Sequence, residues 1–309
     1  LKDVEDRSPI WKALLKAERN ARSSKIERLK CAPLRYPVLM GYNKVLYPLL
    51  KRGVFVHAKT FFGIRIKTLL PAGTDILLNG IKSHDSEIRL TKFLTRHLHE
   101  GDTFIDVGAH YGYYALLGSV MTGRSGHVFA IEASAHSFAI LKENTDTHPN
   151  ILIYHNAAGE APGEVVFYEY PGPLAEYNTI VKGAYDDKAW IKKVKQTINR
   201  VQMVVLDDLI TSNQISKAII KIDVEGGELS VIKGLASSLQ QSDLTIVVEY
   251  LISEDLSSPH HLAVRLLIEH GYQAHAIDRE GNLVKVVVID QYLRDAGLDS
   301  DNLVFVKGK

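Results

Sequence analysis

Four acidic side chains lie at the ends of apolar segments, where they could bind a cofactor or move a proton. Asp106, Glu132, Asp223 and Glu249 each close or directly follow a short apolar run. Such runs predict buried strands of a parallel sheet, and the carboxyl ends of these strands form the usual ligand-binding edge. We therefore expect the four carboxylates to gather at one edge of the sheet and to face a ligand.

The glycine turn after Asp106 narrows the choice of ligand. Residues 103–113 have the sequence TFIDVGAHYGY, so Gly108 and Gly112 are spaced as GxxxG. This differs from the GxGxxG turn that holds a dinucleotide pyrophosphate. A ligand that lacks a pyrophosphate but carries an amino-acid tail needs one close backbone approach and one carboxylate for its ammonium group. S-adenosylmethionine (SAM) has these features, so the pattern favours methyl transfer; an ordinary strand-to-helix turn is the alternative.

Alternating strands and helices are predicted to position these residues. Because such alternation is typical of parallel sheets with right-handed crossovers, we expect an α/β fold with a doubly wound, mostly parallel, seven-stranded sheet of the Rossmann-like type. The predicted strands are residues 103–107, 127–131, 151–154, 218–222, 244–248, 272–277 and 303–306. The predicted helices between them are residues 113–122, 138–147, 228–239 and 260–269.

We predict two parts along the chain. Residues 1–52 form a helical extension, in which residues 9–30 have the pattern of an amphipathic helix with a basic face. This helix either packs on its own domain or makes a peripheral contact with a membrane surface or a partner. Residues 53–309 form the second domain, in which a hairpin (54–59 and 64–70) and a roofing helix with Ser86 or Asp85 as its N-cap precede a core at 101–309. The core carries a β insertion at 164–210, with β segments at 165–168 and 201–205.

Composition excludes several classes of protein. The 309 residues include 37 Lys and Arg against 36 Asp and Glu, so the net charge of +1 gives no global field for a nucleic acid. Cys31 is the only cysteine, which excludes a disulfide framework or a cysteine zinc site within one chain. No apolar run approaches the roughly 20 residues that span a bilayer. We therefore expect a cytoplasmic protein that acts on a small molecule.

Several motifs in order point to a family. They are GDTFIDVGAHYGY at 101–113, LDDL at 206–209 and IKIDVEGGE at 220–228, followed by TIVVE at 245–249 and NLVFV at 302–306. From about Gly53 onward the chain resembles the FkbM family of SAM-dependent O-methyltransferases. The resemblance implies a class I SAM methyltransferase fold. It also implies methyl transfer to a hydroxyl of a sugar or polyketide-type molecule, with S-adenosylhomocysteine as the second product. His110 departs from the asparagine that the family usually has at this position.

The expected cofactor site surrounds the glycine turn. Asp106 would bind the methionyl ammonium or, alternatively, cap a backbone turn. Glu132 lies 24 residues after Gly108, close to the spacing at which an acidic side chain accepts hydrogen bonds from ribose hydroxyls; a solvated loop glutamate is the alternative. Asn156 and Ala157 would meet the adenine edge, although asparagine is also common in turns. The full predicted set is Glu87, Asp106, Gly108, Ala109, His110, Tyr111, Gly112, Glu132, Ala133, Asn156 and Ala157.

The expected catalytic residues are Asp223 and Glu225. Methyl transfer to a hydroxyl requires that the oxygen lose its proton, and a carboxylate can accept it. Asp223 would act as this base or would orient the substrate, and Glu225 would orient the hydroxyl. In a less favoured alternative, both carboxylates and Glu249 coordinate Mg²⁺. A nucleotide-binding module without catalysis and an NAD-binding oxidoreductase are the rival functions, and the missing GxGxxG disfavours the second.

Overall fold

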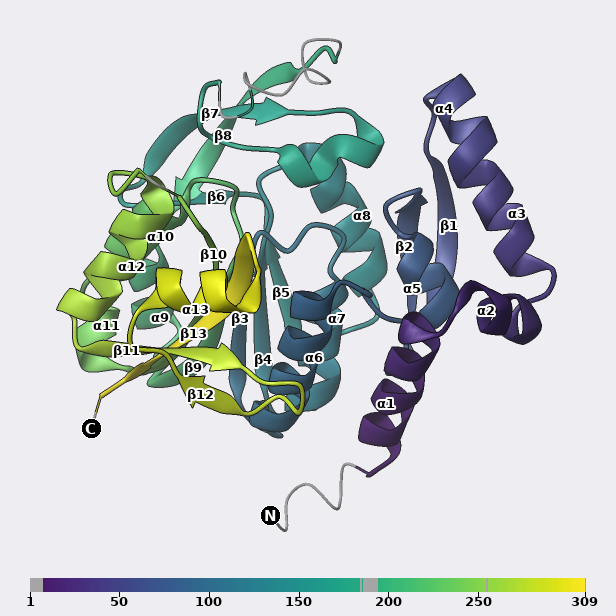
Figure 1. Ribbon diagram of the computed structural model, residues 1–309. Coiled ribbons are helices and arrows are strands. Elements are labelled where there is room, and N and C mark those ends of the chain that lie inside the picture. The colour runs from purple at the N-terminus through teal and green to yellow at the C-terminus, as the bar shows by residue number, and fades with distance from the viewer. Residues whose placement is uncertain (1–7, 184, 186–193, 254, 309) are drawn as a thin grey trace.

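A mixed sheet forms the centre of the protein (Figure 1). The computed structural model describes residues 8–183, 185, 194–253 and 255–308, and within them this sheet has eight strands. In spatial order these are β12 (Leu283–Lys285), β11 (Tyr272–Ile277), β13 (Ser300–Lys307), β10 (Asp243–Leu251), β9 (Lys217–Ile222), β3 (Thr103–Val107), β4 (His127–Ile131) and β5 (Ile151–Tyr154). Strands β10, β9, β3, β4 and β5 are parallel, whereas β13, β11 and β12 each run antiparallel to their neighbours. All seven predicted strands are present, and the short edge strand β12 is an addition to them.

Helices cover both faces of the sheet, as predicted for a doubly wound fold. Side chains alternate between the faces of a strand, so Phe104 and Ile105 of β3 enter different hydrophobic clusters. The cluster of Phe104 includes residues of α6 (Asp85–His97), α7 (Tyr113–Thr122) and α8 (Ala135–Thr145). The cluster of Ile105 includes residues of α9 (Leu206–Ser212), α10 (Glu228–Lys233), α11 (Ser238–Gln241), α12 (Pro259–Glu269) and α13 (Ile289–Ala296). The ligand-binding edge therefore has a rigid, two-sided support.

Two predicted helices are interrupted, each for a local reason. The helix expected at 9–30 is two helices, α1 (Ser8–Arg22) and α2 (Lys25–Cys31), because Ser24 and Glu27 form a capping box that starts α2. The helix expected at 228–239 ends at Lys233. A Cβ at Gly234 would lie 2.2 Å from the carbonyl oxygen of Gly159, so this close approach requires glycine.

The roofing helix begins where it was expected, but its N-cap differs from the prediction. Helix α6 starts at Asp85, and His84 rather than Asp85 or Ser86 is the N-cap residue. Arg89 of α6 forms a buried bidentate ion pair with Asp301 of β13, at 2.8 and 2.9 Å. Because both partners are buried and paired, this contact fixes α6 over the antiparallel end of the sheet.

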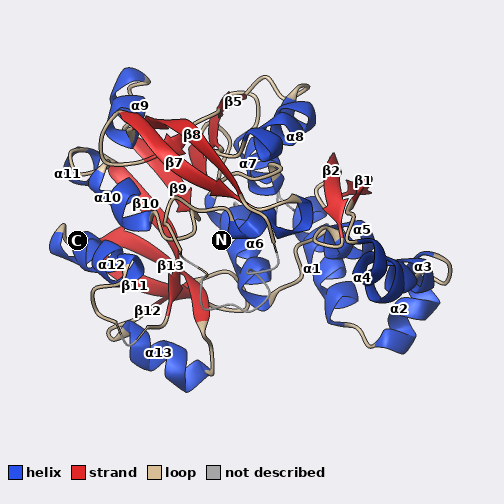
Figure 2. Cartoon of the chain, turned by 90° about the horizontal axis from the view of Figure 1, so that it is seen from above, coloured by secondary structure: helices blue, strands red, loops and turns tan. Residues whose placement is uncertain are grey.

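The N-terminal part lies at one side of the body in both views (Figures 1 and 2). Helix α1 packs through Leu14, Ala17 and Ala21 against Ile81 and Ile88. The predicted hairpin is present as β1 (Val54–Lys59) and β2 (Arg65–Leu70). Helix α3 (Arg35–Gly41), a π-helical turn (Tyr42–Leu46), α4 (Tyr47–Leu50) and α5 (Thr74–Asn79) were not predicted. Among the described helices, none combines the length and the apolar character that crossing a membrane requires.

The β insertion forms a small sheet of its own. Strand β7 (Gly163–Glu169) pairs with β8 (Thr197–Val204), and β8 also pairs with β6 (Ala157–Ala158), which precedes the predicted insertion. A 3₁₀ helix (Gly172–Tyr177) follows β7. The β segments predicted at 165–168 and 201–205 fall on β7 and β8. Figure 1 shows this sheet above the carboxyl ends of β4 and β5, so the insertion can contribute one wall of a site there.

Candidate functional site

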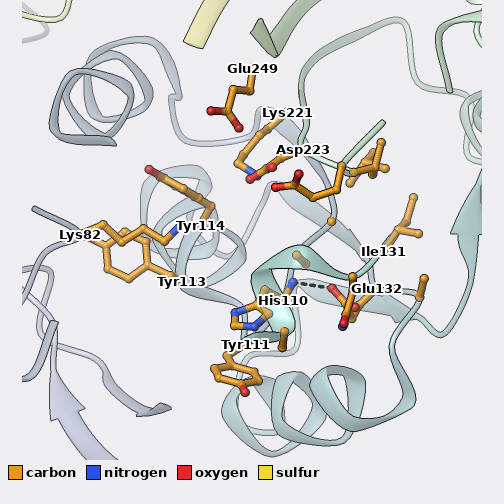
Figure 3. A pocket seen from close by; sticks show the side chains of 18 of the residues that line it. Lys82, His110, Tyr111, Tyr113, Tyr114, Ile131, Glu132, Lys221, Asp223 and Glu249 are labelled. Carbon is orange, nitrogen blue, oxygen red and sulfur yellow. Dashed lines mark hydrogen bonds and ion pairs between the residues drawn. The ribbon is translucent and has the colours of Figure 1, made fainter. Parts of the chain in front are cut away.

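A cavity of about 400 Å³ opens at the carboxyl ends of β3, β4 and β9 (Figure 3). Strand β2, the α5–α6 loop, the turn after β3 and the insertion each contribute part of its wall. Of the residues predicted from sequence, the described lining contains Glu87, Gly108, Ala109, His110, Tyr111, Glu132, Ala133, Asn156, Ala157, Asp223, Glu225 and Glu249. Asp106 and Gly112 are not part of this lining. The fold thus brings together predicted residues that are up to 162 positions apart in the sequence.

The turn after β3 depends on its first glycine. Gly108 has a φ of +81°, and a Cβ there would lie 1.9 Å from the carbonyl oxygen of Asp223. The turn and the loop after β9 therefore touch through their backbones, which brings both loops to the same cavity. Gly112 has a φ of +89° and is the N-cap of α7, where a Cβ would meet Leu141 at 2.7 Å. Its lack of a side chain serves the packing of α7 on α8.

Glu132 is held by the backbone. Its carboxylate accepts hydrogen bonds from the backbone N–H of His110 at 2.7 Å and of Ser134 at 2.8 Å. Figure 3 shows the first of these bonds beside the cavity. Burial raises the pKa of Glu132 to about 7, although the two N–H groups oppose this shift. A carboxylate has about four acceptor positions, so two remain for a ligand.

A buried lysine joins two acidic residues. Nζ of Lys221 lies 2.9 Å from Oδ2 of Asp223 and 3.6 Å from Oδ1 of Asp106. Burial raises the pKa of Asp223, but the charges of Lys221 and Lys82 outweigh burial and hold the pKa below its usual value. Burial also lowers the pKa of Lys221, and the charges of Asp223 and Asp106 more than reverse this. Asp223 is therefore an ionised carboxylate with a fixed counter-charge.

Asp106 lies behind this pair with 1% of its surface exposed. No described residue gives a hydrogen bond to either of its carboxylate oxygens. Burial raises the pKa of Asp106, and the charge of Lys221 opposes the shift. A buried acceptor with unused capacity is costly unless a ligand or water satisfies it, and the ammonium of Lys221, 3.6 Å away, is the described cation beside it.

Three carboxylates meet at the other end of the cavity. Among the described residues, Asp223, Glu225 and Glu249 place one oxygen each within 4.8 Å of one another. Burial first, and then the charge of Asp223, raise the pKa of Glu225 to about 8 and of Glu249 to about 7. The hydroxyl of Tyr185 donates a hydrogen bond to Glu225 at 2.6 Å. These oxygens suit a hard cation such as Mg²⁺, yet the ammonium of Lys221 already balances one of the three charges.

His110 contributes mainly through its backbone. Its ring stacks on Tyr111, with 3.8 Å between the ring centroids. Burial, helped by the charge of Lys82, lowers the pKa of His110 to about 3, so the ring is a weak base at neutral pH. The α7 helix is capped by Gly112 and not by this histidine. The imidazole therefore forms part of the wall where the family usually has asparagine.

The remaining predicted residues lie on separate walls. The hydroxyl of Tyr114 donates a short hydrogen bond to Glu87, and Lys82 Nζ lies 3.2 Å from the same carboxylate. Asn156 donates from its amide nitrogen to the carbonyl oxygen of Gln202 at 3.2 Å, while Ala157 pairs with β8 as part of β6. Glu228, expected at a helix N-terminus, accepts from the backbone N–H of Gly226 at 3.1 Å.

Sequence reasoning missed the two cationic residues of the cavity. Lys221 had a usable signal, because it is one charged residue in the otherwise apolar segment 218–222 and a charge on a buried strand needs a partner. Lys82 gave no comparable signal, since it follows a short helix that was itself not predicted. Tyr113 and Tyr114 also line the cavity.

Comparisons with known proteins identify relatives of this chain. Residues 106–274 match the family model described as the methyltransferase FkbM domain. Over 169 residues the chain is 29% identical to the hexuronic acid methyltransferase AglP of Haloferax volcanii, and the match covers 54% of this chain and 64% of that protein. The chain therefore spans less than two thirds of the length of this curated relative.

Several solved structures that match this chain are methyltransferases, and two of them serve as examples. The FkbM methyltransferase of Methylobacillus flagellatus is 17% identical, with 66% of this chain and 43% of that chain covered and a TM-score of 0.39. A SAM-dependent O-methyltransferase of Thermotoga maritima is 13% identical, with 85% and 82% covered and a TM-score of 0.39. Because the family model matches more than half of the sequence, the protein belongs to the FkbM family of methyltransferases, which confirms the family that its motifs indicated.

Proposed function

We propose that this methyltransferase uses SAM and methylates a hydroxyl oxygen of a sugar. One observation carries the proposal: a carboxylate with free acceptor positions, Glu132, and an ionised carboxylate, Asp223, face one cavity from the two strands beside β3. Glu132 can bind a nucleoside, and Asp223 can orient a hydroxyl group.

The residues around the glycine turn fit SAM. Gly108 permits a close approach to the backbone, and the free acceptor positions of Glu132 suit the two ribose hydroxyls. Asp106 offers an unsatisfied buried carboxylate to the methionyl ammonium, directly or through a water molecule. Ala133, Asn156 and Ala157 would border the adenine, and the remaining predicted residues, Glu87, Ala109, His110 and Tyr111, would border the rest of the cofactor.

The residues near the acceptor would remove one proton from its hydroxyl group. When bound, SAM supplies an electrophilic methyl group, so the transfer forms a C–O bond, breaks the C–S bond and leaves S-adenosylhomocysteine. Asp223, kept ionised by Lys221, would accept a hydrogen bond from the acceptor hydroxyl and orient its oxygen. Glu225 would receive the proton, because a pKa of about 8 is close to the working pH, where proton acceptors are most effective.

A sugar is the acceptor that we favour over a polyketide-type molecule. The name of the Haloferax volcanii relative specifies a hexuronic acid, and clustered carboxylates can accept several hydrogen bonds from a polyol. The near-neutral charge balance gives no support for a nucleic-acid substrate. A cytoplasmic location is also part of the proposal, and the single cysteine is compatible with it.

Calorimetry tests the cofactor, and mass spectrometry tests the acceptor. We expect the protein to bind SAM and S-adenosylhomocysteine but not NAD, and to add one methyl group to hexose or hexuronic acid acceptors. Binding of NAD alone would overturn the proposal in favour of the oxidoreductase. Binding of SAM with no methyl transfer to sugars, but with transfer to a polyketide hydroxyl, would replace the acceptor and retain the chemistry.

Removal of divalent cations tests the role of Lys221 as the local counter-charge. Because its ammonium lies 2.9 Å from Asp223, we expect turnover to be unchanged after treatment with EDTA. Loss of turnover that Mg²⁺ restores would show instead that Asp223, Glu225 and Glu249 act as metal ligands.

A further inference from the structure

An apolar stripe lies on the outer side of the continuous helical run formed by α3, the π-helical turn and α4. Leu34, Val38, Val45 and Leu49 are 81%, 70%, 56% and 75% exposed. They follow one another at intervals of four, seven and four residues, which places them on one face of a helix. Side chains of this kind are normally buried, so a continuous exposed stripe indicates a surface that another body covers.

The opposite face of the same run contacts the protein. Leu39 is buried, and the side-chain amide of Asn43 donates a hydrogen bond to Oγ1 of Thr74 in α5 at 3.0 Å. Figures 1 and 2 both show α2, α3 and α4 at the outside of the molecule, beyond the hairpin. The stripe is therefore directed away from the body that could otherwise bury it.

The surroundings of the stripe are strongly basic. Residues 25–52, which we name the basic arm, contain seven Lys and Arg and one acidic residue, Glu27. Six of these seven cations are exposed: Lys25, Lys30, Arg35, Lys44, Lys51 and Arg52. The other residues of the chain contain 30 basic and 35 acidic side chains, so the positive charge is concentrated in the basic arm.

This combination selects one occupant. Apolar side chains flanked by Lys and Arg are the composition of helices that lie in a bilayer interface and attract anionic lipids. A second copy of the chain laid on the same face would bring two sets of cations together without counter-charges. We propose that the basic arm docks this methyltransferase on the surface of an anionic membrane, with Leu34, Val38, Val45 and Leu49 inserted among the lipids.

Flotation of the whole protein with lipid vesicles tests the proposal without using activity. We expect binding to vesicles that contain about 30% phosphatidylglycerol in phosphatidylcholine, and little binding to phosphatidylcholine alone. The bound fraction should fall as salt is added, because exposed charges are screened. No binding to the anionic vesicles at low salt would overturn the proposal.

Two sets of substitutions separate the apolar and electrostatic contributions. We expect Leu34→Ser, Val38→Ser and Leu49→Ser, combined, to lower binding to anionic vesicles more than about tenfold. The combined control Leu256→Ser and Val287→Ser removes equally exposed apolar side chains elsewhere and should leave binding unchanged.

Charge reversal in the basic arm tests the electrostatic contribution. Lys44→Glu, Lys51→Glu and Arg52→Glu, combined, should abolish binding, whereas Lys217→Glu with Lys285→Glu should not. Calorimetry with SAM serves as the folding control, since none of these residues lines the described cavity wall. Equal binding by the wild type and both basic-arm variants would overturn the proposal. So would a dimer that the serine variant dissociates while vesicles fail to bind, because a second copy would then be the occupant.

Discussion

Glu132 and Asp223 occupy equivalent places on the strands that flank β3, but their surroundings differ. Each is the first residue after its strand, and each lines the same cavity. Glu132 is held by the backbone N–H groups of His110 and Ser134, whereas Asp223 is held by the ammonium of Lys221. Neutral donors hold one carboxylate in place, and a full positive charge holds the other.

The difference separates binding from chemistry. Backbone donors only partly oppose the effect of burial, so the pKa of Glu132 rises to about 7 and its charge can respond to a ligand. Lys221 and Lys82 overcome burial at Asp223, which stays ionised. Glu132 is therefore suited to recognise the cofactor, and Asp223 is suited to orient an acceptor before its proton leaves. If the two carboxylates shared one role, substitution of either would change SAM affinity and turnover together.

The largest expected effect follows Asp223→Asn. Loss of the ionised carboxylate that orients the acceptor hydroxyl should lower kcat by at least about 10²-fold, the cost of misplacing a reacting group. The dissociation constant for SAM should change less than about threefold, because Asp223 contacts the acceptor in our proposal. Steady-state kinetics and calorimetry measure the two quantities. A loss of SAM affinity as large as the loss of turnover would show that Asp223 also binds the cofactor.

Gly108→Ala should disturb both carboxylates together, because the turn at Gly108 touches the backbone of Asp223. The added Cβ would meet that carbonyl oxygen at 1.9 Å, so we expect the free energy of unfolding to fall by about 3 kcal/mol. Gly271→Ala is a matched control: its φ of +85° is close to the +81° of Gly108, and its Cβ would meet no described atom within 4 Å. We expect the control to cost about 1 kcal/mol in urea unfolding. If both variants lost the same free energy of unfolding, the loss would come from the positive φ that they share and not from the contact with Asp223.

Glu132→Gln should act on binding and leave chemistry intact. Hydrogen bonds to a charged group contribute about 1.5–3 kcal/mol, so we expect the dissociation constant for SAM to rise about 10- to 100-fold. At saturating SAM, kcat should remain within about threefold of the wild-type value. Glu100→Gln, an exposed glutamate after α6, is the control for the loss of a negative charge. A fall in kcat at saturation without a change in affinity would exchange the roles assigned to Glu132 and Asp223.

Features set by neighbouring residues could be predicted from the sequence. The apolar runs identify the strands of the sheet, and the turn at Gly108 and the position of Glu132 follow from spacing within one strand–helix–strand unit. The start of α2 is also determined by neighbouring residues, because Ser24 and Glu27 form a capping box. The helical pattern of the longer segment 9–30 concealed this signal. Local chemistry therefore contained more information than the periodicity alone.

Features set by distant residues could not be predicted in this way. The break at Gly234 depends on the carbonyl of Gly159, and Lys82 reaches the cavity only because α5 and α6 place its loop there. The approach of Glu225 to Glu249 depends on two separate strands of the sheet. The raised pKa values of these glutamates result from burial in the assembled site, which no spacing in the sequence specifies.

A pH dependence of the free energy of unfolding should belong to Glu132. Its pKa rises from 4.5 to about 7 in the folded protein, so the folded state holds a proton that the unfolded state releases between these values. Its contribution to the free energy of unfolding is therefore fully present below 4.5 and is lost as the pH rises through 7. Urea unfolding of the unliganded protein should show this loss, and Glu132→Gln should reduce it; an unchanged pH profile would assign the effect to Glu225 or Glu249.

The affinity for SAM should depend on pH in the opposite direction to the free energy of unfolding, and should increase as the pH rises. Ribose hydroxyls that donate to Glu132 favour its ionised form, so we expect SAM to bind up to about tenfold more tightly above pH 7 than below it. Binding below pH 7 should release a proton, which calorimetry in buffers of different ionisation enthalpy measures. Glu132→Gln should reduce the release, whereas Asp223→Asn should retain it because Asp223 is already ionised. Loss of the proton release in the Asp223→Asn variant alone would mean that the carboxylate beside Lys221, and not the one held by backbone amides, senses the cofactor.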